Sequence, residues 1–184
     1  MVYECSEYEF IARLGPGEMA VWLEDRYLVL SRVRSASGVK YQEGDTVFWS
    51  KGEDALLELD GQRHSDCQQV PARVPWEDAR RRGVDFRGVG NEPGWTVEVR
   101  DNQHILFQGD YGATRVLAAD PQLTKIGNVR VYQADYHGQP LRVSISNAFC
   151  RDTMADITYP STVTVEFADR SYRGCGRDLD HPWE

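Results

Sequence analysis

The chain has 184 residues, of which 41% are hydrophobic and 27% are charged, a balance typical of folded domains and unlike that of disordered chains. This length allows one large domain or two small ones, each with a core of its own. The net charge of −8 argues against nucleic acid as a partner, because phosphates demand a basic surface. No run of about 18 apolar residues occurs, so the sequence predicts no membrane-spanning helix.

The acidic excess is larger in the first part of the chain. Residues 1–75 hold 13 acidic and 8 basic side chains, a net charge of −5, which favours a basic partner. The first residues lead directly into a strand-like pattern, without the basic start and apolar core of a signal peptide.

Residues 8–33 predict three short β-strands. These are the runs Tyr8–Leu14, Met19–Leu23 and Arg26–Val33, with a Gly-Pro-Gly-Glu turn after the first. The first and third runs alternate with a period of two, as expected of strands with one buried and one wet face. The alternating positions are Tyr8, Phe10, Ala12 and Leu14, followed by Tyr27 and Val29.

The stretch from Ser35 to Leu57 has the pattern of a hairpin followed by a further strand. A turn-rich Ser-Ala-Ser-Gly segment is followed by a short strand, a polar turn over residues 42–45, a strand over Thr46–Trp49, and a turn at Lys51 and Gly52. Loops held on a rigid sheet often carry binding residues. No segment before Pro71 has a helical period, so the short strands predict a small antiparallel barrel or sandwich.

Proline and glycine mark the boundary after this first part. Val70–Pro75 contains two prolines, which predict an irregular linker. Residues Pro75–Gly83 then predict a short helix, with acids in its first turn, arginines in its last turn and a final glycine. We therefore predict a first β-domain over residues 1–72, a linker with a short helix over 73–83, and a second β-rich domain, a barrel or sandwich, over 84–184.

The second domain contains strand-like runs and a Gly-Asn-Glu-Pro-x-Trp motif. In this motif Asn91, Glu92 and Trp95 allow two interpretations, a recognition surface or a structural loop with the tryptophan in the core, and we favour the second. Residues 86–99 predict a loop that leads into an alternating strand, and the further predicted strands are 105–107, 114–118, 129–136, 141–146 and 162–167.

Four cysteines allow three disulfide pairings. The simplest has one bridge in each domain, Cys5–Cys67 and Cys150–Cys175, and implies an oxidising compartment such as the bacterial periplasm. A metal site built on Cys67 and His64 lacks further closely spaced ligands, so we predict no metal.

The first part of the chain resembles a known family. The order Ser-Ala-Ser-Gly-x-Lys-Tyr followed by Val-Phe-Trp-Ser-Lys-Gly-x-x-Ala, with Tyr3-x-Cys5 before it and Cys67 after it, is similar to the MliC/PliC inhibitors of C-type lysozyme. The resemblance covers about residues 3–70. It implies a β-barrel in the periplasm or on a bacterial membrane, with a C-type lysozyme, typically a strongly cationic protein, as partner and with no cofactor and no catalytic residue.

The resemblance also implies a binding site. Ser37 and Lys51 match the serine and lysine with which the family enters the lysozyme cleft and contacts its catalytic carboxyls. A lysozyme uses one carboxylic acid and one carboxylate about 5 Å apart, and an ammonium beside a hydroxyl would occupy both. The expected lysozyme-binding residues are Ser35, Ser37, Gly38, Lys40, Tyr41 and Lys51. For Tyr41, and for Trp49 near it, core packing is the favoured alternative.

The second part resembles an uncharacterised family of bacterial envelope lipoproteins over about residues 84–177. The resemblance rests on the Gly-Asn-Glu-Pro-x-Trp motif, the segment from Cys150 to Pro160, and Gly-Cys175-Gly, and it implies no activity. Since the resemblance to the MliC/PliC inhibitors implies export, we expect that Met1 replaces a removed signal sequence, and a lipid-carrying cysteine at the end of that sequence is one form it could take.

Two other classes of function stay open. An enzyme is disfavoured because the four histidines are scattered and no Gly-x-Ser-x-Gly, phosphate-loop or His-Glu-x-x-His motif occurs, although catalytic groups can meet in space. A non-inhibitory envelope protein, whose second domain binds a small ligand or an envelope partner, is the main alternative.

Overall fold

The computed structural model describes residues 1–23 and 25–179. Glu24 and residues 180–184, among them His181 and the end of the predicted second domain, lie outside this description. The chain divides into two compact units, Met1–Glu77 (unit 1) and Asp78–Glu184 (unit 2), which are described separately below. Among the described residues, no helix is both long enough and apolar enough to cross a membrane.

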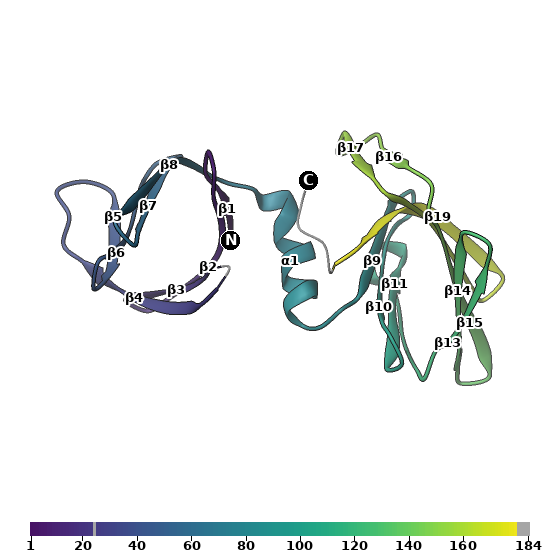
Figure 1. Cartoon of the computed structure of the whole chain (residues 1–184). Helices are drawn as coiled ribbons and strands as arrows, with labels where there is room; N and C mark the ends of the chain where they lie inside the picture. The colour runs from purple at the N-terminus through teal and green to yellow at the C-terminus, as the bar shows by residue number, and fades with distance from the viewer. Residues whose placement is uncertain (24, 180–184) are drawn as a thin grey trace. The chain divides into compact units, whose positions relative to one another are not determined.

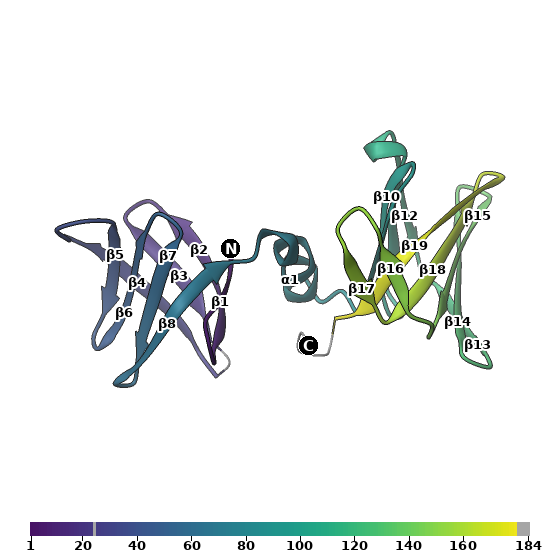
Figure 2. The same cartoon turned by 90° about the horizontal axis from the view of Figure 1, so that it is seen from above.

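In the described part of unit 1, eight antiparallel strands form a closed barrel (Figures 1 and 2). Each strand pairs with the next along the chain, and β8 returns to β1, with Tyr3 opposite Gln69. The β-barrel that the family resemblance implied is therefore confirmed. The strands are β1 Val2–Glu4, β2 Glu9–Gly15, β3 Glu18–Trp22, β4 Tyr27–Val33, β5 Val39–Glu43, β6 Thr46–Lys51, β7 Asp54–Leu59 and β8 Gln62–Gln69.

An aromatic cluster fills the barrel. The Tyr3 ring stacks on Phe10 with centroids 5.1 Å apart, and Phe48 meets both rings edge-on. Aliphatic side chains from the other strands complete the core, so that the rings are almost fully removed from water. The disulfide Cys5–Cys67 joins the β1–β2 connection to β8, as predicted.

The predicted alternation is correct for the middle of β2 and wrong for β4. Phe10 and Ala12 face the core, whereas Leu14, near the end of β2, is 53% exposed. In β4 the core-facing side chain is Leu30, with Leu28 packed against the core, and Tyr27 is 53% exposed. The sequence Tyr-Leu-Val-Leu is apolar on both faces, so its period cannot select the inner one; the pairing of Met19 with Leu30 does.

The segment after β8 is helical and not irregular, which corrects the prediction for Val70–Pro75. A 3₁₀ turn, Pro71–Arg73, leads directly into α1, Val74–Arg81. Both prolines lie in the first turn of a helix, where a backbone N–H would have no intrahelical acceptor, so neither interrupts the structure. The predicted glycine stop is present, because Gly83 has φ +78° and donates to the carbonyl of Arg80.

A buried arginine fixes the start of this helical segment within unit 1. Arg73 is 6% exposed and makes a two-pronged ion pair with Glu9, with both N···O distances 2.8 Å. It also contacts Glu4, and the carboxylate of Glu77 lies 3.6 Å away. Several acceptors around one buried guanidinium offset the cost of removing it from water.

Within residues 78–179, unit 2 is a curled antiparallel sheet of nine strands with a separate two-stranded hairpin (Figures 1 and 2). The order across the sheet is β12-β11-β10-β9-β19-β18-β15-β14-β13, and the all-β prediction is confirmed. The strands are β9 Phe86–Asn91, β10 Gly94–Arg100, β11 His104–Gly109, β12 Thr114–Ala119, β13 Gln122–Ile126, β14 Val129–Tyr136, β15 Gln139–Ser146, β18 Ser161–Phe167 and β19 Arg170–Asp178; the hairpin is β16 Cys150–Asp152 with β17 Ile157–Tyr159.

In the Gly-Asn-Glu-Pro-x-Trp motif at residues 90–95, Trp95 has the core position that we favoured. Trp95 is 4% exposed and packs near Phe107 and Tyr172 in the core. A Cβ atom on Gly90 would lie 2.1 Å from the indole nitrogen of Trp95, so only glycine fits there. The side chain of Asn91 donates to Asp152 at 2.7 Å and so holds the hairpin β16–β17, which the predicted disulfide Cys150–Cys175 also ties to β19.

Asp110, between β11 and β12, accepts several hydrogen bonds that favour its charged form. Partial removal from water raises the pKa of this carboxyl, but hydrogen bonds from Tyr172 and Thr114, each 3.1 Å long, and Arg170 at 2.7 Å together lower it below its usual 3.8. A lowered pKa in the folded state stabilises the fold above the unfolded pKa, and this contribution is lost as the pH falls through the folded pKa.

We therefore expect Asp110→Asn to destabilise unit 2 at neutral pH and to have a progressively smaller effect as the pH falls from about 4 to about 2. Asparagine tolerates the positive φ of this position, +53°, so backbone strain does not confuse the comparison. Amide hydrogen exchange of the unit 2 strands across this pH range measures the difference. A difference that stays constant with pH would contradict the assignment.

Candidate functional site

Two connections of the barrel meet at one of its ends. The loop of residues 34–38 follows β4, and the two-residue turn Gly52-Glu53 follows β6. Because β4 and β6 flank β5 and both run antiparallel to it, the two connections emerge on the same end. The structure thus brings together the two segments that hold Ser37 and Lys51.

Gly38 is where the loop and the end of β6 touch. A Cβ atom placed on Gly38 would lie 2.2 Å from the carbonyl oxygen of Ser50 and 3.1 Å from Cβ of Lys51. Its φ of +69° lies in the left-handed region, which glycine adopts without strain. Both the close approach and the backbone conformation therefore require glycine at this position.

Polar contacts fix the shape of the loop. The hydroxyl of Ser35 lies 2.9 Å from the carbonyl oxygen of Ser37 and 3.0 Å from that of Gly38. From β6, the indole nitrogen of Trp49 donates to the same Ser37 carbonyl at 2.9 Å. Ser35 is therefore a loop-shaping residue, and the backbone of Ser37 is held from two sides.

The side chains of Ser37 and Lys51 are exposed. Within residues 1–23 and 25–179, neither the Ser37 hydroxyl nor the Lys51 ammonium has a hydrogen-bond or ion-pair partner. The fold therefore fixes the backbone under both groups and leaves their polar ends available to a partner.

Tyr41 lies in the barrel core, whereas Trp49 lies on the outer face of the barrel. Tyr41 is 7% exposed and belongs to the barrel core, as the favoured alternative held, so little of its surface is available to a partner. The prediction of core packing is wrong for Trp49. This residue is half-buried and pairs with Lys40 on the outer face. The signal was in the sequence, because adjacent residues of a strand face opposite sides and Phe48 fills the core.

Sequence reasoning missed the charge of this end of the barrel. Four of the eight basic side chains of residues 1–75 lie on the two hairpins that form it, although this part of the chain is acidic overall. They are Arg32, Arg34, Lys40 and Lys51, all exposed or half-exposed. The signal was the run of bases over residues 32–40. A local basic patch favours contact with carboxylates.

Cys67 and His64 lie in contacts other than a metal site. Cys67 is oxidised in the disulfide with Cys5, and the His64 ring lies against Tyr8 with centroids 4.6 Å apart. In the part of the chain that the structure describes, no three His, Cys, Asp or Glu side chains are grouped to hold a metal ion.

The barrel with this end coincides with a match to a known family. Residues 3–66 match the model of the family MliC, described as membrane-bound lysozyme-inhibitor of C-type lysozyme. The barrel is similar to MliC. The match covers about a third of the chain and does not reach unit 2, for which the resemblance to envelope lipoproteins stays a prediction.

A curated relative and a search of solved structures complete the comparison. The chain is 42% identical over 43 residues to the membrane-bound lysozyme inhibitor of C-type lysozyme from Yersinia enterocolitica. This stretch is 23% of the present chain and spans only 37% of the relative's length. No solved structure matches the chain.

The contact at Gly38 leads to a test with a matched glycine. Gly38→Ala introduces both a left-handed alanine and a clash with Ser50, and we expect it to destabilise the barrel by about 3 kcal/mol. Gly44→Ala, at φ +55° with no atom within 4 Å of the added Cβ, introduces the backbone strain alone and should cost about 1 kcal/mol. Hydrogen exchange of the barrel amides measures both; equal effects would mean that the Gly38 contact is unimportant.

Proposed function

We propose that unit 1 inhibits a C-type lysozyme by placing residues 35–38 and the side chain of Lys51 in the active-site cleft of the enzyme. The observation that carries the proposal is the junction at Gly38. It holds Ser37 and Lys51 on one exposed end of a barrel whose sequence matches the MliC model. The relative from Yersinia enterocolitica is itself named as an inhibitor of C-type lysozyme.

The chemistry of the two groups suits a pair of catalytic carboxyls. The Lys51 ammonium has three hydrogens to donate and carries a full positive charge, so it complements the ionised carboxylate. The Ser37 hydroxyl both donates and accepts, so it suits the carboxyl that holds a proton. Occupying both groups would exclude substrate and water without any catalytic step or cofactor.

The rigid backbone contributes to affinity. Ordering a loop on binding opposes association, and a loop that is already ordered loses less entropy. The contacts of Ser35, Gly38 and Trp49 hold the loop before any partner arrives. In addition, no internal ion pair of Lys51 among the described residues has to be broken before it can bind.

Charge acts at two ranges in this proposal. The net charge of −5 over residues 1–75 would attract a cationic lysozyme from a distance and speed encounter at low salt. At contact range, the basic residues Arg34, Lys40 and Lys51 would face the acidic cleft.

The proposed function also implies a location. We place the protein in the bacterial envelope, exposed to the periplasm and held by an N-terminal lipid anchor. An oxidising compartment of this kind keeps two disulfides stable.

A bacterial cell-wall lysis assay tests the proposal. A C-type lysozyme is titrated with the whole protein and with Ser37→Ala and Lys51→Ala variants. We expect stoichiometric inhibition by the native protein. Loss of either group leaves a cleft carboxyl without its partner, which corresponds to about 2–5 kcal/mol, or a weakening of about 30-fold or more.

Matched controls separate the site from general effects. Arg13→Ala removes an exposed positive charge from β2, and Ser31→Ala removes an exposed hydroxyl from β4. Both controls should inhibit as well as the native protein. Equal loss in controls and site variants, or full inhibition by Lys51→Ala, would contradict the proposed site, and absence of inhibition of any C-type lysozyme would contradict the function.

A further inference from the structure

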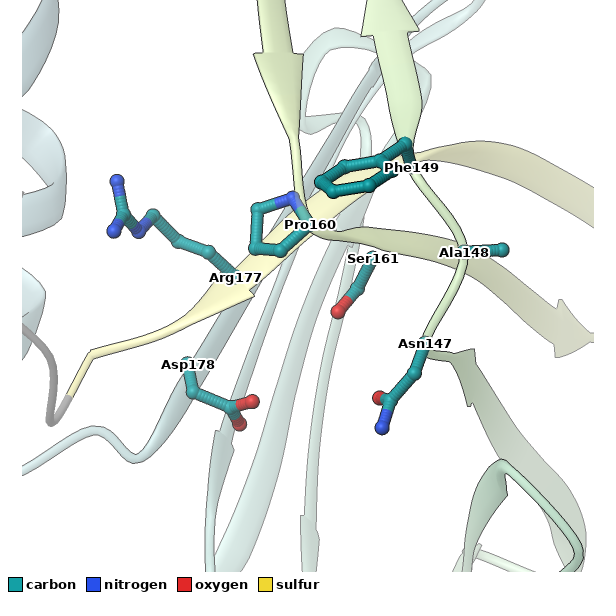
Figure 3. A pocket seen from close by; sticks show the side chains of 7 residues that line it. All are labelled: Asn147, Ala148, Phe149, Pro160, Ser161, Arg177 and Asp178. Atoms are coloured by element: carbon teal, nitrogen blue, oxygen red, sulfur yellow. The ribbon is translucent and has the colours of Figure 1, made fainter. Parts of the chain in front are cut away.

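Unit 2 contains a pocket at the base of the hairpin β16–β17, far along the chain from the proposed inhibitory loop. The pocket has a volume of about 410 Å³, within the range of small-molecule sites (Figure 3). Residues on both sides of the hairpin and the end of β19 line it, among them Asn147, Phe149, Pro160, Ser161, Arg177 and Asp178.

One part of the pocket is apolar and unusually open to water. The side chain of Phe149 is 85% exposed and lies beside Pro160 in Figure 3. Phe149 directly precedes Cys150, whose disulfide with Cys175 holds it to the sheet. An exposed aromatic ring on a pocket lining offers a flat apolar surface to a ligand.

The other part of the pocket contains a hydroxyl group that no protein group occupies. Ser161 is 2% exposed, and within residues 1–23 and 25–179 its hydroxyl has no hydrogen-bond partner. Figure 3 shows the hydroxyl directed toward the space between the side-chain ends of Asp178 and Asn147. Because this hydroxyl faces the pocket and has no protein partner, a ligand group that donates or accepts there can hydrogen-bond with it.

The charges around the pocket favour a neutral ligand. The carboxylate of Asp178 is already balanced by Arg130, whose Nη2 lies 2.7 and 2.9 Å from its two oxygens. Arg177 interacts electrostatically with Tyr159 and is not an isolated charge. Asp178 nevertheless keeps lone pairs that can accept further hydrogen bonds, and the amide of Asn147 can both donate and accept.

We propose that this pocket binds a neutral saccharide. The C–H face of a sugar ring would lie on Phe149, and its hydroxyl groups would hydrogen-bond with Ser161, Asn147 and Asp178. A sugar combines an apolar face with several neutral donors and acceptors, which is the combination that this pocket presents. The proposal does not depend on lysozyme inhibition, because every residue that it uses lies in unit 2.

Nuclear magnetic resonance titrations of the whole protein test this site. The probes are N-acetylglucosamine, its β-1,4-linked disaccharide and maltose, each added up to about 10 mM, well above the Kd of a weak millimolar site. We expect saturable shifts of the amides of residues 147–149 and 175–178 with at least one of them. Phe149→Ala, at an exposed position that does not support the core, should weaken binding about tenfold or more.

A matched control variant and a titration with an anion complete the experiment. Met154→Ala removes another exposed apolar side chain from the same hairpin, outside the pocket, and should leave the Kd unchanged. Inorganic phosphate tests whether Arg177 attracts an anion instead. No saturable shift with any saccharide, equal affinity in Phe149→Ala, or binding of phosphate alone would overturn the proposal.

Discussion

The close approach of Gly38 to the end of β6 is the constraint on which the proposed site depends. A side chain of any size at residue 38 would collide with the carbonyl of Ser50. Without one, the loop after β4 can lie directly against the strand that ends in Lys51, and the hydrogen bond from Trp49 to the Ser37 carbonyl holds it there. Two side chains 14 positions apart in the sequence, Ser37 and Lys51, thus belong to one surface, with their polar ends exposed.

The barrel provides the rigidity that this end needs. Closure of β8 onto β1 leaves no free sheet edge within the described part of unit 1, and the Cys5–Cys67 bridge links the same region covalently. Strong aromatic packing inside the barrel fixes β5 and β6 in register. A binding loop on such a support combines a defined backbone with side chains that are free to meet a partner.

The sequence was most informative where residue type dictates geometry. Glycine at 38, serine at 35 and the cysteine spacing predicted the loop and both disulfides. It was least informative where both faces of a strand are apolar, as in β4, because there the tertiary partner decides which face is buried. The short helix after Pro75 was predicted, but the helical turn at Pro71–Arg73 was missed because proline was taken only as a breaker, although the first turn of a helix accepts it. The pocket of unit 2 could not be predicted, because Asn147, Ser161 and Asp178 come from separate strands and loops.

The most direct test of the account is hydrogen exchange of the whole protein with and without a saturating C-type lysozyme. If residues 35–38 and Lys51 enter the cleft, amides over residues 35–40 and 50–53 should gain protection. The β7–β8 turn at Asp60 and Gly61, which lies at the opposite end of the barrel, should be unchanged. Protection centred on that opposite end, or on unit 2 alone, would contradict the central claim even if the lysozyme were inhibited.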